Sequence, residues 1–126
     1  MAIQNSNRDL KTYKVAAATG STYVIGYISA ANTVARATGT GVQFCGVIEN
    51  NPATSSDVAS VCTLGITKVH AGTGAITRGA KLTSDARGYA IASANDATAP
   101  VIGTAEEAST VDGQLIEIKV LPVIGS

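Results

Sequence analysis

The chain has one histidine, His70, which lies directly before a predicted turn. Its imidazole could act as a general acid or base or as a metal ligand. A general base must lie beside a nucleophile or an acid, and the nearest partners in the sequence are Thr67 and Thr73. The acidic pair Glu106-Glu107 is a poor catalytic couple, because adjacent residues of a strand point to opposite faces. These residues predict no active site, and we interpret His70 as a surface histidine at a strand end.

Cys45 and Cys62 are the only cysteines, and both stand in apolar, strand-like contexts. The favoured interpretation is two reduced, buried thiols that behave as small hydrophobic side chains. A disulfide between neighbouring strands is the alternative, and it depends on a Cα–Cα distance that a sequence does not give. Together with His70 they lack the close-spaced pairs of zinc sites. No metal site and no cofactor are therefore predicted.

Two loops contain polar residues at turn-like spacing. Gly72-Thr73-Gly74 is similar to a fragment of a phosphate-binding loop, but it opens no helix whose N-terminus would hold an anion. Asp85 lies in the segment Ser-Asp-Ala-Arg-Gly, where its carboxylate is expected to cap a turn. Arg78 and Arg87 are expected to form surface ion pairs at most. Neither loop predicts a ligand site.

The composition favours β-sheet over helix. Val and Ile together number 23 against 5 Leu, and there are 15 Thr. Such β-branched residues suit a pleated sheet and lose side-chain freedom in a helix. The 21 Ala residues favour helix by propensity, but they alternate with Thr, Ser and Gly and form no 3.6-residue stripe. At 126 residues, the chain is predicted to be one all-β domain.

Short extended segments alternate with turn signals, at a spacing that suits a small β-barrel or sandwich. The predicted strands are residues 13–17, 22–30, 33–37, 42–49, 58–69, 81–83, 89–92, 101–105 and 114–121. The longest loops are expected at residues 50–57 and 93–100. Gly46 in mid-strand and a change of phase near Gly65 predict β-bulges. Pro122 is expected to end the last strand.

Two strands carry patterns that bear on packing. Residues 22–30 have apolar side chains on both faces, with Tyr23 and Tyr27 on the same one. This predicts a strand covered on both sides by the domain, or once by the domain and once by a partner. In the strand of residues 42–49, Phe44 and Val47 are expected to lie on opposite faces.

An extended N-terminal arm is predicted over residues 1–12, with a single β domain over residues 13–126. The arm is polar apart from Ile3 and Leu10. It is either a frayed terminus or a segment that orders on a partner, with these two side chains as apolar anchors and with Arg8 and Lys11 as polar ones.

Tyr23 and Tyr27 are further candidates for self-association or contact with a partner, because of the two-sided apolar pattern of their strand. Val123 and Ile124 are candidates as well, since this C-terminal tail is apolar for an exposed end.

The charge balance excludes several classes of partner. The chain has 9 basic and 9 acidic residues, and charged residues make up 14% of it. Nucleic acid needs a positive patch, and a membrane surface that recruits by charge needs one as well. A net charge near zero favours self-association or docking onto a larger assembly. The sequence shows no signal peptide and no apolar run of about 20 residues, so synthesis in the cytoplasm is expected.

Several segments follow one another in a characteristic order. They are Gly46-Val47-Ile48, residues 58–64 leading to Gly65 and Val69, residues 75–82 (AITRGAKL), residues 84–90 (SDARGYA), residues 101–105 (VIGTA), and Asp112-Gly113-Gln114 with the strand to Val120. In order and spacing they resemble the head decoration, or capsid cement, proteins of tailed bacteriophages. The resemblance covers residues 28–121, while the first thirty residues match the family poorly.

The resemblance implies a structural virion protein without catalytic activity or cofactor. Its fold would be β-tulip-like. It would bind the outer surface of an icosahedral phage capsid as a trimer or another small cluster, and it would stabilise the shell by bridging neighbouring subunits of the major capsid protein. Such bridging sums many weak contacts over a lattice and needs no deep pocket.

Two other classes remain open. One is a β-rich binding module of the tail-fibre or adhesin type that recognises carbohydrate or a host surface. Such sites usually present aromatic platforms, whereas aromatic residues make up 4% of this chain and Trp is absent. The other is a small β-barrel enzyme, which needs a catalytic dyad or triad that the sequence does not show.

Overall fold

A computed structural model describes residues 8–39, 44–54, 57–93 and 100–124, with the backbone alone at Arg8 and at residues 122–124. Nine strands form one sheet in this part of the chain. They are β1 (Arg8–Val15), β2 (Val24–Ala30), β3 (Thr33–Arg36), β4 (Phe44–Ile48), β5 (Val58–His70), β6 (Lys81–Ser84), β7 (Ala90–Ala92), β8 (Pro100–Ala105) and β9 (Leu115–Ile124). The predicted all-β fold is confirmed. Within the described ranges, no helix is long and apolar enough to cross a membrane.

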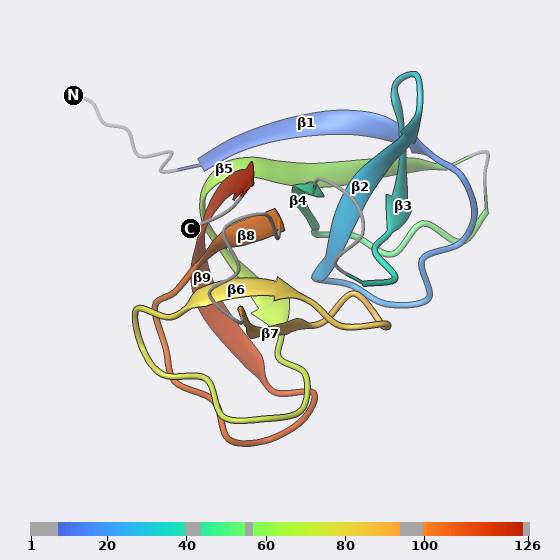
Figure 1. Cartoon of the computed structure of the whole chain (residues 1–126). Helices are drawn as coiled ribbons and strands as arrows, with labels where there is room; N and C mark the ends of the chain where they lie inside the picture. The colour runs from blue at the N-terminus through green and yellow to red at the C-terminus, as the bar shows by residue number, and fades with distance from the viewer. Residues whose placement is uncertain (1–7, 40–43, 55–56, 94–99, 125–126) are drawn as a thin grey trace.

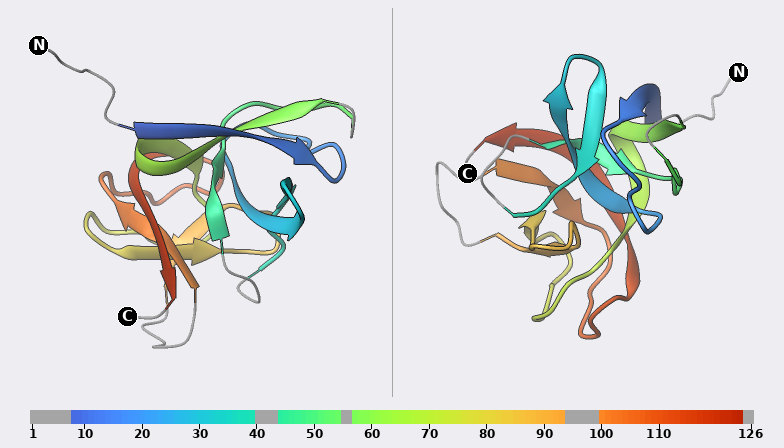
Figure 2. Two further views of the ribbon diagram at one scale, coloured as in Figure 1. Left: turned by 90° about the horizontal axis from the view of Figure 1, so that it is seen from above. Right: turned by 90° about the vertical axis from the view of Figure 1, so that its right-hand side faces the viewer.

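Five of the strands close into a barrel. Neighbours in the sheet run β1–β3–β2–β4–β5, and β5 pairs again with β1. The β1–β3 pair is parallel and short, and the other pairs are antiparallel. Figure 1 shows β1 and β5 side by side along the top of the molecule, and Figure 2 shows the same neighbours from two further sides. Of the two predicted architectures, the barrel is confirmed.

The other four strands extend the sheet from β5 in the order β9–β8–β6–β7. β5 is common to both halves, because its first half pairs with β1 and β4 and its second half with β9. A bridge between Ala71, directly after β5, and Ala90 in β7 brings the far edge of the extension back to β5. The N–H of Gly72 donates to the carbonyl of Ala90 at 2.7 Å. The extension therefore curls almost into a second barrel.

The domain has two apolar cores, one for the five-stranded barrel and one for the extension of the sheet. The smaller core lies inside the barrel and consists of Tyr13, Val15, Val24, Val34, Ile48, Ala59 and Val61. The larger core lies between the barrel wall and the extension and includes Ile25, Phe44, Val47, Cys62, Val69, Leu82, Ile102, Ile116, Ile118 and Val120. Val24 and Ile25 are adjacent in β2 and enter different cores. The domain itself therefore covers both faces of β2 at residues 24–26, whereas residues 28–30 are exposed, so the first of the two predicted alternatives holds only for the start of the strand.

A bulge in β5 separates the half that pairs with β1 and β4 from the half that pairs with β9. The register with β1 shifts at Thr63, which has no residue opposite it, and Gly65 follows with a φ of +107°. The extra residue reverses the alternation of the strand. Cys62 before the bulge and Val69 after it consequently enter the same core. The predicted change of phase is confirmed.

Gly46 produces the second predicted bulge. The register between β2 and β4 shifts beside it, and a Cβ at Gly46 would collide with the carbonyl oxygen of Cys62. The same shift overturns one prediction. Phe44 and Val47 were expected on opposite faces, but both enter the larger core, because the bulge reverses the alternation between them.

The N-terminal arm is shorter than predicted. β1 begins at Arg8, and residues 8–12 pair with β5, so the boundary at residue 12 is wrong for this part of the chain. Asp9, Leu10, Lys11 and Thr12 are all exposed. These residues belong to the sheet because their backbone pairs with β5, and not because their side chains are buried. Their sequence therefore shows no alternation of apolar and polar residues that would predict a strand. Ile3 lies outside the described residues.

The last strand does not end at Pro122. β9 continues to Ile124, with Val123 paired to Val101 and Ile124 paired to Pro100. The register shifts by one residue between Val101 and Gly103. A bulge is a position where a strand tolerates proline, which has no N–H to donate. The prediction was wrong because it did not include this bulge.

Candidate functional site

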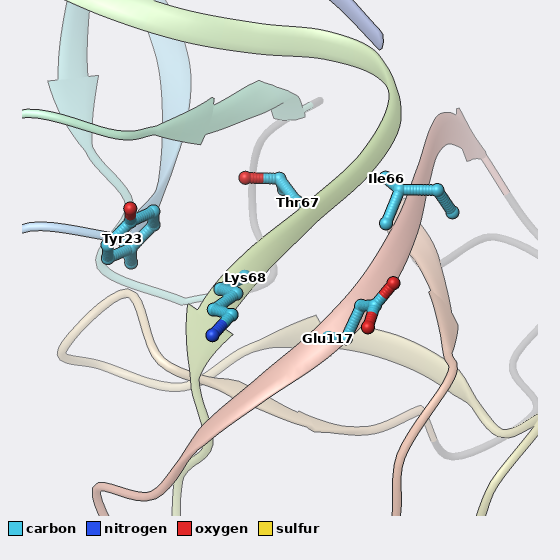
Figure 3. A pocket seen from close by; sticks show the side chains of 5 residues that line it. All are labelled: Tyr23, Ile66, Thr67, Lys68 and Glu117. Atoms are coloured by element: carbon cyan, nitrogen blue, oxygen red, sulfur yellow. The ribbon is translucent and has the colours of Figure 1, made fainter. Parts of the chain in front are cut away.

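A pocket of about 280 Å³ lies beside β5, just beyond its bulge. It is lined by Tyr23, Ile66, Thr67, Lys68 and Glu117 (Figure 3). Lys68 of β5 is directly opposite Glu117 of β9 in the antiparallel register. The lining therefore combines a cation, a carboxylate and a phenol with the apolar side chain of Ile66. The volume of the pocket is near the lower end for small-molecule sites.

Tyr23 reaches this pocket through an unusual backbone conformation. It precedes β2 and has a φ of +54°, which non-glycine residues rarely adopt. Its carbonyl oxygen accepts a hydrogen bond from the N–H of His70 at 3.1 Å. This bond ties the start of β2 to the end of β5. The surrounding structure thus holds Tyr23 in a strained conformation next to the hollow.

Thr67 forms the inner wall of the pocket. Its side chain is buried, and its hydroxyl donates to the carboxylate of Glu49, which directly follows β4. A buried hydroxyl needs such a partner, because an unsatisfied polar group costs about 1–3 kcal/mol. The bond fixes β5 to the barrel at the point where the strand leaves it.

A cluster of side chains around Tyr89 lies at the end of β5, next to His70. The imidazole of His70 stacks on the Tyr89 ring with centroids 5.1 Å apart, and the guanidinium of Arg87 lies 4.4 Å from the same centroid. His70 Nδ1 is 3.0 Å from the carbonyl oxygen of Gly113. His70 is at the end of β5, as predicted, and its ring is engaged with structural partners rather than with a nucleophile.

Arg87 links two loops of the cluster. Its guanidinium lies 2.9 Å from Asp85 and 2.6 Å from Asp112. Hydrogen bonds to Asp112 and Asp85 raise the pKa of Arg87, and the bond from Arg87 holds the pKa of Asp112 below its usual value. Asp85 accepts hydrogen bonds from the N–H groups of Arg87 and Tyr89 at 2.8 and 3.0 Å. The predicted role of Asp85 as a turn cap is confirmed.

Arg36 connects the cluster to the barrel. Its guanidinium donates to the carbonyl oxygens of Thr19, at 2.6 Å, and of Arg87. The N–H of Ile25 donates to the carbonyl of Gly88 at 2.8 Å alongside. These bonds join the loop before Tyr23 to the turn between β6 and β7, and so they help to place Tyr23.

The chemistry open to the described residues is limited. Thr67 is bonded to Glu49, and His70 is bonded to Gly113. In the ranges that the structure covers, no group of three or more His, Cys, Asp and Glu side chains is placed to hold a metal ion. Within the described ranges, Cys45 and Cys62 form no disulfide, and Cys62 is buried. Burial raises the pKa of Cys45 to about 11, against a smaller opposing effect of a backbone hydrogen bond.

The predicted contact residues whose side chains the structure describes lie on different parts of the fold. Leu10 and Lys11 are exposed on β1, where the Lys11 ammonium lies 5.0 Å from the centroid of the Tyr13 ring. Tyr23 lines the pocket, whereas Tyr27 is half-buried and packs against the larger core.

The three other predicted contact residues are less fully described. The backbone of Arg8 belongs to β1, and the backbones of Val123 and Ile124 belong to β9. Because Arg8 pairs with Gly65 and Val123 pairs with Val101, these residues lie on different strand pairs of the sheet.

Sequence reasoning missed most of the pocket. Ile66, Thr67, Lys68 and Glu117 come together only through the pairing of β5 with β9. It also missed several exposed apolar side chains, which are Ile28, Val58, Leu64, Val111, Leu115 and Leu121. For Leu115 and Leu121 a signal existed, because they occupy the outward positions of a strand whose other outward residues are charged.

Comparison with known proteins identifies the fold. No protein-family model matches the sequence, and no curated protein is significantly similar to it. Among solved structures, the crystal structure of the head fiber gp8.5 N base of bacteriophage phi29 matches with a TM-score of 0.65. The chain shares the fold of a phage head protein. The match covers 90% of this chain and 93% of the phage protein at 21% sequence identity. The predicted resemblance to phage head proteins is thus confirmed at the level of fold.

Proposed function

We propose that this chain is a structural protein of a phage head, bound to the outer surface of the capsid. The observation that carries the proposal is the similarity in fold to a phage head fiber base over nearly the whole length of both chains. In this proposal the protein bridges neighbouring subunits of the major capsid protein. It acts as a homotrimer on the virion exterior, and it has no catalytic activity and no cofactor.

The surface of the protein supports docking onto other proteins. Charged residues make up only 14% of the chain, so few charges need to be desolvated when the surface is buried. Seven large apolar side chains are exposed, and they are spread over the described surface: Leu10, Ile28, Val58, Leu64, Val111, Leu115 and Leu121. Scattered apolar contacts of this kind are individually weak, and a repeating lattice sums them.

Cryo-electron microscopy of heads from the phage that encodes the chain tests the proposal. The expected result is ordered density for this fold on the outside of the shell, repeated at symmetry axes and absent from heads made without the chain. Heads that contain the chain but show no such density would overturn it. Light scattering of the purified protein tests the trimer separately, and a monomer at all accessible concentrations would contradict that part.

The contact surface is tested by one matched pair of variants. Leu10 is about half exposed on β1, so Leu10→Asp is expected to leave the fold intact and to weaken binding to heads. Ala18→Asp introduces the same charge at another exposed position and is expected to bind normally. Equal binding by both variants would remove Leu10 from the proposed contact surface.

A further inference from the structure

The sequence contains one Asp-Gly pair, Asp112-Gly113, and no Asn-Gly pair. In an Asp-Gly pair the backbone nitrogen of the glycine can attack the side-chain carbonyl carbon of the aspartate, because glycine has no side chain that obstructs the approach. Asp112 is exposed and Gly113 is half-buried, in the loop directly before β9. Of the aspartates in the chain, Asp112 is therefore the one most open to this backbone rearrangement.

The rearrangement has two steps and needs no co-reactant other than water. In the first step, the nitrogen of Gly113 forms a bond to Cγ of Asp112 and loses its proton, while the carboxyl group loses its hydroxyl. One water leaves, and a succinimide ring forms. In the second step, water opens the ring at the main-chain carbonyl carbon of Asp112, so that the peptide runs through the side chain as isoaspartate. The first step requires a protonated carboxyl group, because a carboxylate cannot lose its oxygen as water.

Arg87 holds the carboxylate of Asp112 at two points. Its Nη2 donates to Oδ1 of Asp112 at 2.6 Å, and its Nη1 donates to Oδ2 at 3.2 Å. These charge-assisted bonds favour the ionised form of the carboxyl group and engage both of its oxygens. Attack by the nitrogen of Gly113 requires the carboxyl group to be neutral and to turn toward the backbone. The contact with Arg87 therefore opposes the first step in two ways.

The backbone around Gly113 is restrained as well. Its N–H donates to the carbonyl oxygen of Ala71 at 2.7 Å, and the N–H of Ala71 donates to the carbonyl oxygen of Gln114 at 2.7 Å. The carbonyl oxygen of Gly113 lies 3.0 Å from Nδ1 of His70. Figure 1 shows the loop before β9 beside the segment that follows β5, at the bottom of the molecule. The nitrogen of Gly113 reaches Cγ only when its bond to Ala71 opens.

We propose that Asp112-Gly113 is a site of spontaneous isomerisation to isoaspartate, and that Arg87 keeps it unmodified in the folded protein. Isoaspartate adds one atom to the main chain between the two residues. The N–H of Gly113 then no longer faces the carbonyl oxygen of Ala71, so the modified chain loses a tie between the loop before β9 and the end of β5. This inference goes beyond the proposed head function and does not depend on it.

Incubation of the full chain at mildly acidic pH, followed by peptide mapping, tests the proposal. Isoaspartate has the same mass as aspartate, so electron-transfer fragmentation is used to distinguish them. Arg87→Ala is expected to raise the rate of isoaspartate formation at Asp112 by about two- to fivefold, in keeping with the strength of exposed ion pairs. Arg78→Ala, at another exposed arginine, is expected to keep the wild-type rate. Equal rates at Asp112 in Arg87→Ala and in the wild type would overturn the proposal.

Asp85 provides an internal control in the same variant. It also loses its contact with Arg87, but Ala86 follows it, so isomerisation at Asp85 is expected to remain much slower than at Asp112. An equal rise at Asp85 would attribute the effect to carboxylates in general and would remove Asp112-Gly113 as a specific site.

A comparison in concentrated urea separates the folded contact from an effect of sequence. Unfolding removes both the contact with Arg87 and the hydrogen bonds of Gly113. The wild type and Arg87→Ala are therefore expected to isomerise at the same rate in urea, and faster than either does when folded. A difference between them that persists in urea would contradict the role of Arg87. A wild-type rate that is the same with and without urea would show that the fold gives no protection.

The modified chain, purified by chromatography, tests the structural consequence. Amide hydrogen exchange at Gly113 and Ala71 is expected to be faster by about tenfold or more, because their bonds across the two segments open to solvent. Ile118 lies opposite Thr67 in the middle of β9 and is expected to keep its rate. Unchanged exchange at Gly113 in the modified chain would contradict the loss of the tie to Ala71.

Discussion

The guanidinium of Arg87 lies 2.6 Å from the carboxylate of Asp112, and this contact ties the turn between β6 and β7 to the loop before β9. The same guanidinium lies 2.9 Å from Asp85 within its own turn. Both Arg87 and Asp112 are exposed. The pair therefore acts through loop geometry and contributes little to overall stability.

The titration of Asp112 should depend on Arg87. Its pKa is lowered from 3.8, first by the hydrogen bond from Arg87. A carboxyl group with a depressed folded-state pKa contributes stability above its unfolded pKa, and this contribution is lost as the pH falls through the folded value. In Arg87→Ala, the pKa of Asp112 is expected to rise toward 3.8, measured by NMR of the carboxyl carbon. Arg78→Ala, at an exposed arginine, is the control. An unchanged Asp112 titration in Arg87→Ala would contradict the assignment.

Gly46 should be intolerant of any side chain, and Gly39 provides a matched control. The two glycines have nearly the same φ, +155° and +153°. A Cβ at Gly46 meets the carbonyl of Cys62, whereas a Cβ at Gly39 meets no atom of the described residues within 4 Å. Gly46→Ala is expected to lower the free energy of unfolding by about 2–4 kcal/mol, and Gly39→Ala by about 1 kcal/mol from backbone strain alone. Urea denaturation measures both. Equal losses would show that the collision at Gly46 relaxes freely.

The sequence was informative about this barrel where its signals are local. β-branched composition, turn spacing and the glycines at residues 46 and 65 indicated strands, bulges and an all-β fold. The errors at residues 8–12 and at Pro122 have different causes. Residues 8–12 are held in the sheet by backbone pairing with β5, and their sequence shows no apolar period. At Pro122, β9 continues because a bulge in its pairing with β8 accommodates the proline.

The thiol of Cys45 should react slowly with labelling reagents in the folded protein. Burial raises its pKa from 9.0 to about 11, so the thiolate at pH 8 is about a hundred times rarer than in the unfolded chain. Labelling by a disulfide reagent at pH 8 is expected to be slow in native protein and fast in denaturant. Because the folded pKa is raised, stability is expected to fall as the pH rises from 9 toward 11. Cys45→Ala should remove that part of the fall. Rapid native labelling of Cys45 would refute the assignment.

The pocket was beyond the reach of the sequence for a different reason. Tyr23 was recognised as a contact candidate from its apolar pattern. Its partners Lys68 and Glu117 are separated by 49 positions in the chain and meet only through the β5–β9 register. The positive φ of Tyr23 was equally hidden, because no glycine or asparagine marks that position.

Arg36 should control the placement of Tyr23 from a distance. Its guanidinium bonds the carbonyls of Thr19 and Arg87, a two-point contact that an ammonium group does not reproduce. Arg36→Ala is expected to lower the free energy of unfolding by about 1–3 kcal/mol, because two carbonyls lose a charged donor. Arg36→Lys should restore only part of the loss. Arg78→Ala, at an exposed position, should change it by less than about 0.5 kcal/mol.

A local measurement separates this role from a general loss of stability. The loop before β2 is tied to β5 by the hydrogen bond from the N–H of His70 to Tyr23. If Arg36 positions this loop, then amide exchange at His70 should accelerate in Arg36→Ala under conditions where Thr67 and Val69, which face β9, keep their rates. Parallel acceleration at all three amides would mean that Arg36 stabilises the fold as a whole and does not position Tyr23 specifically. Acceleration at His70 alone would link the Tyr89 cluster to the pocket through this one backbone bond.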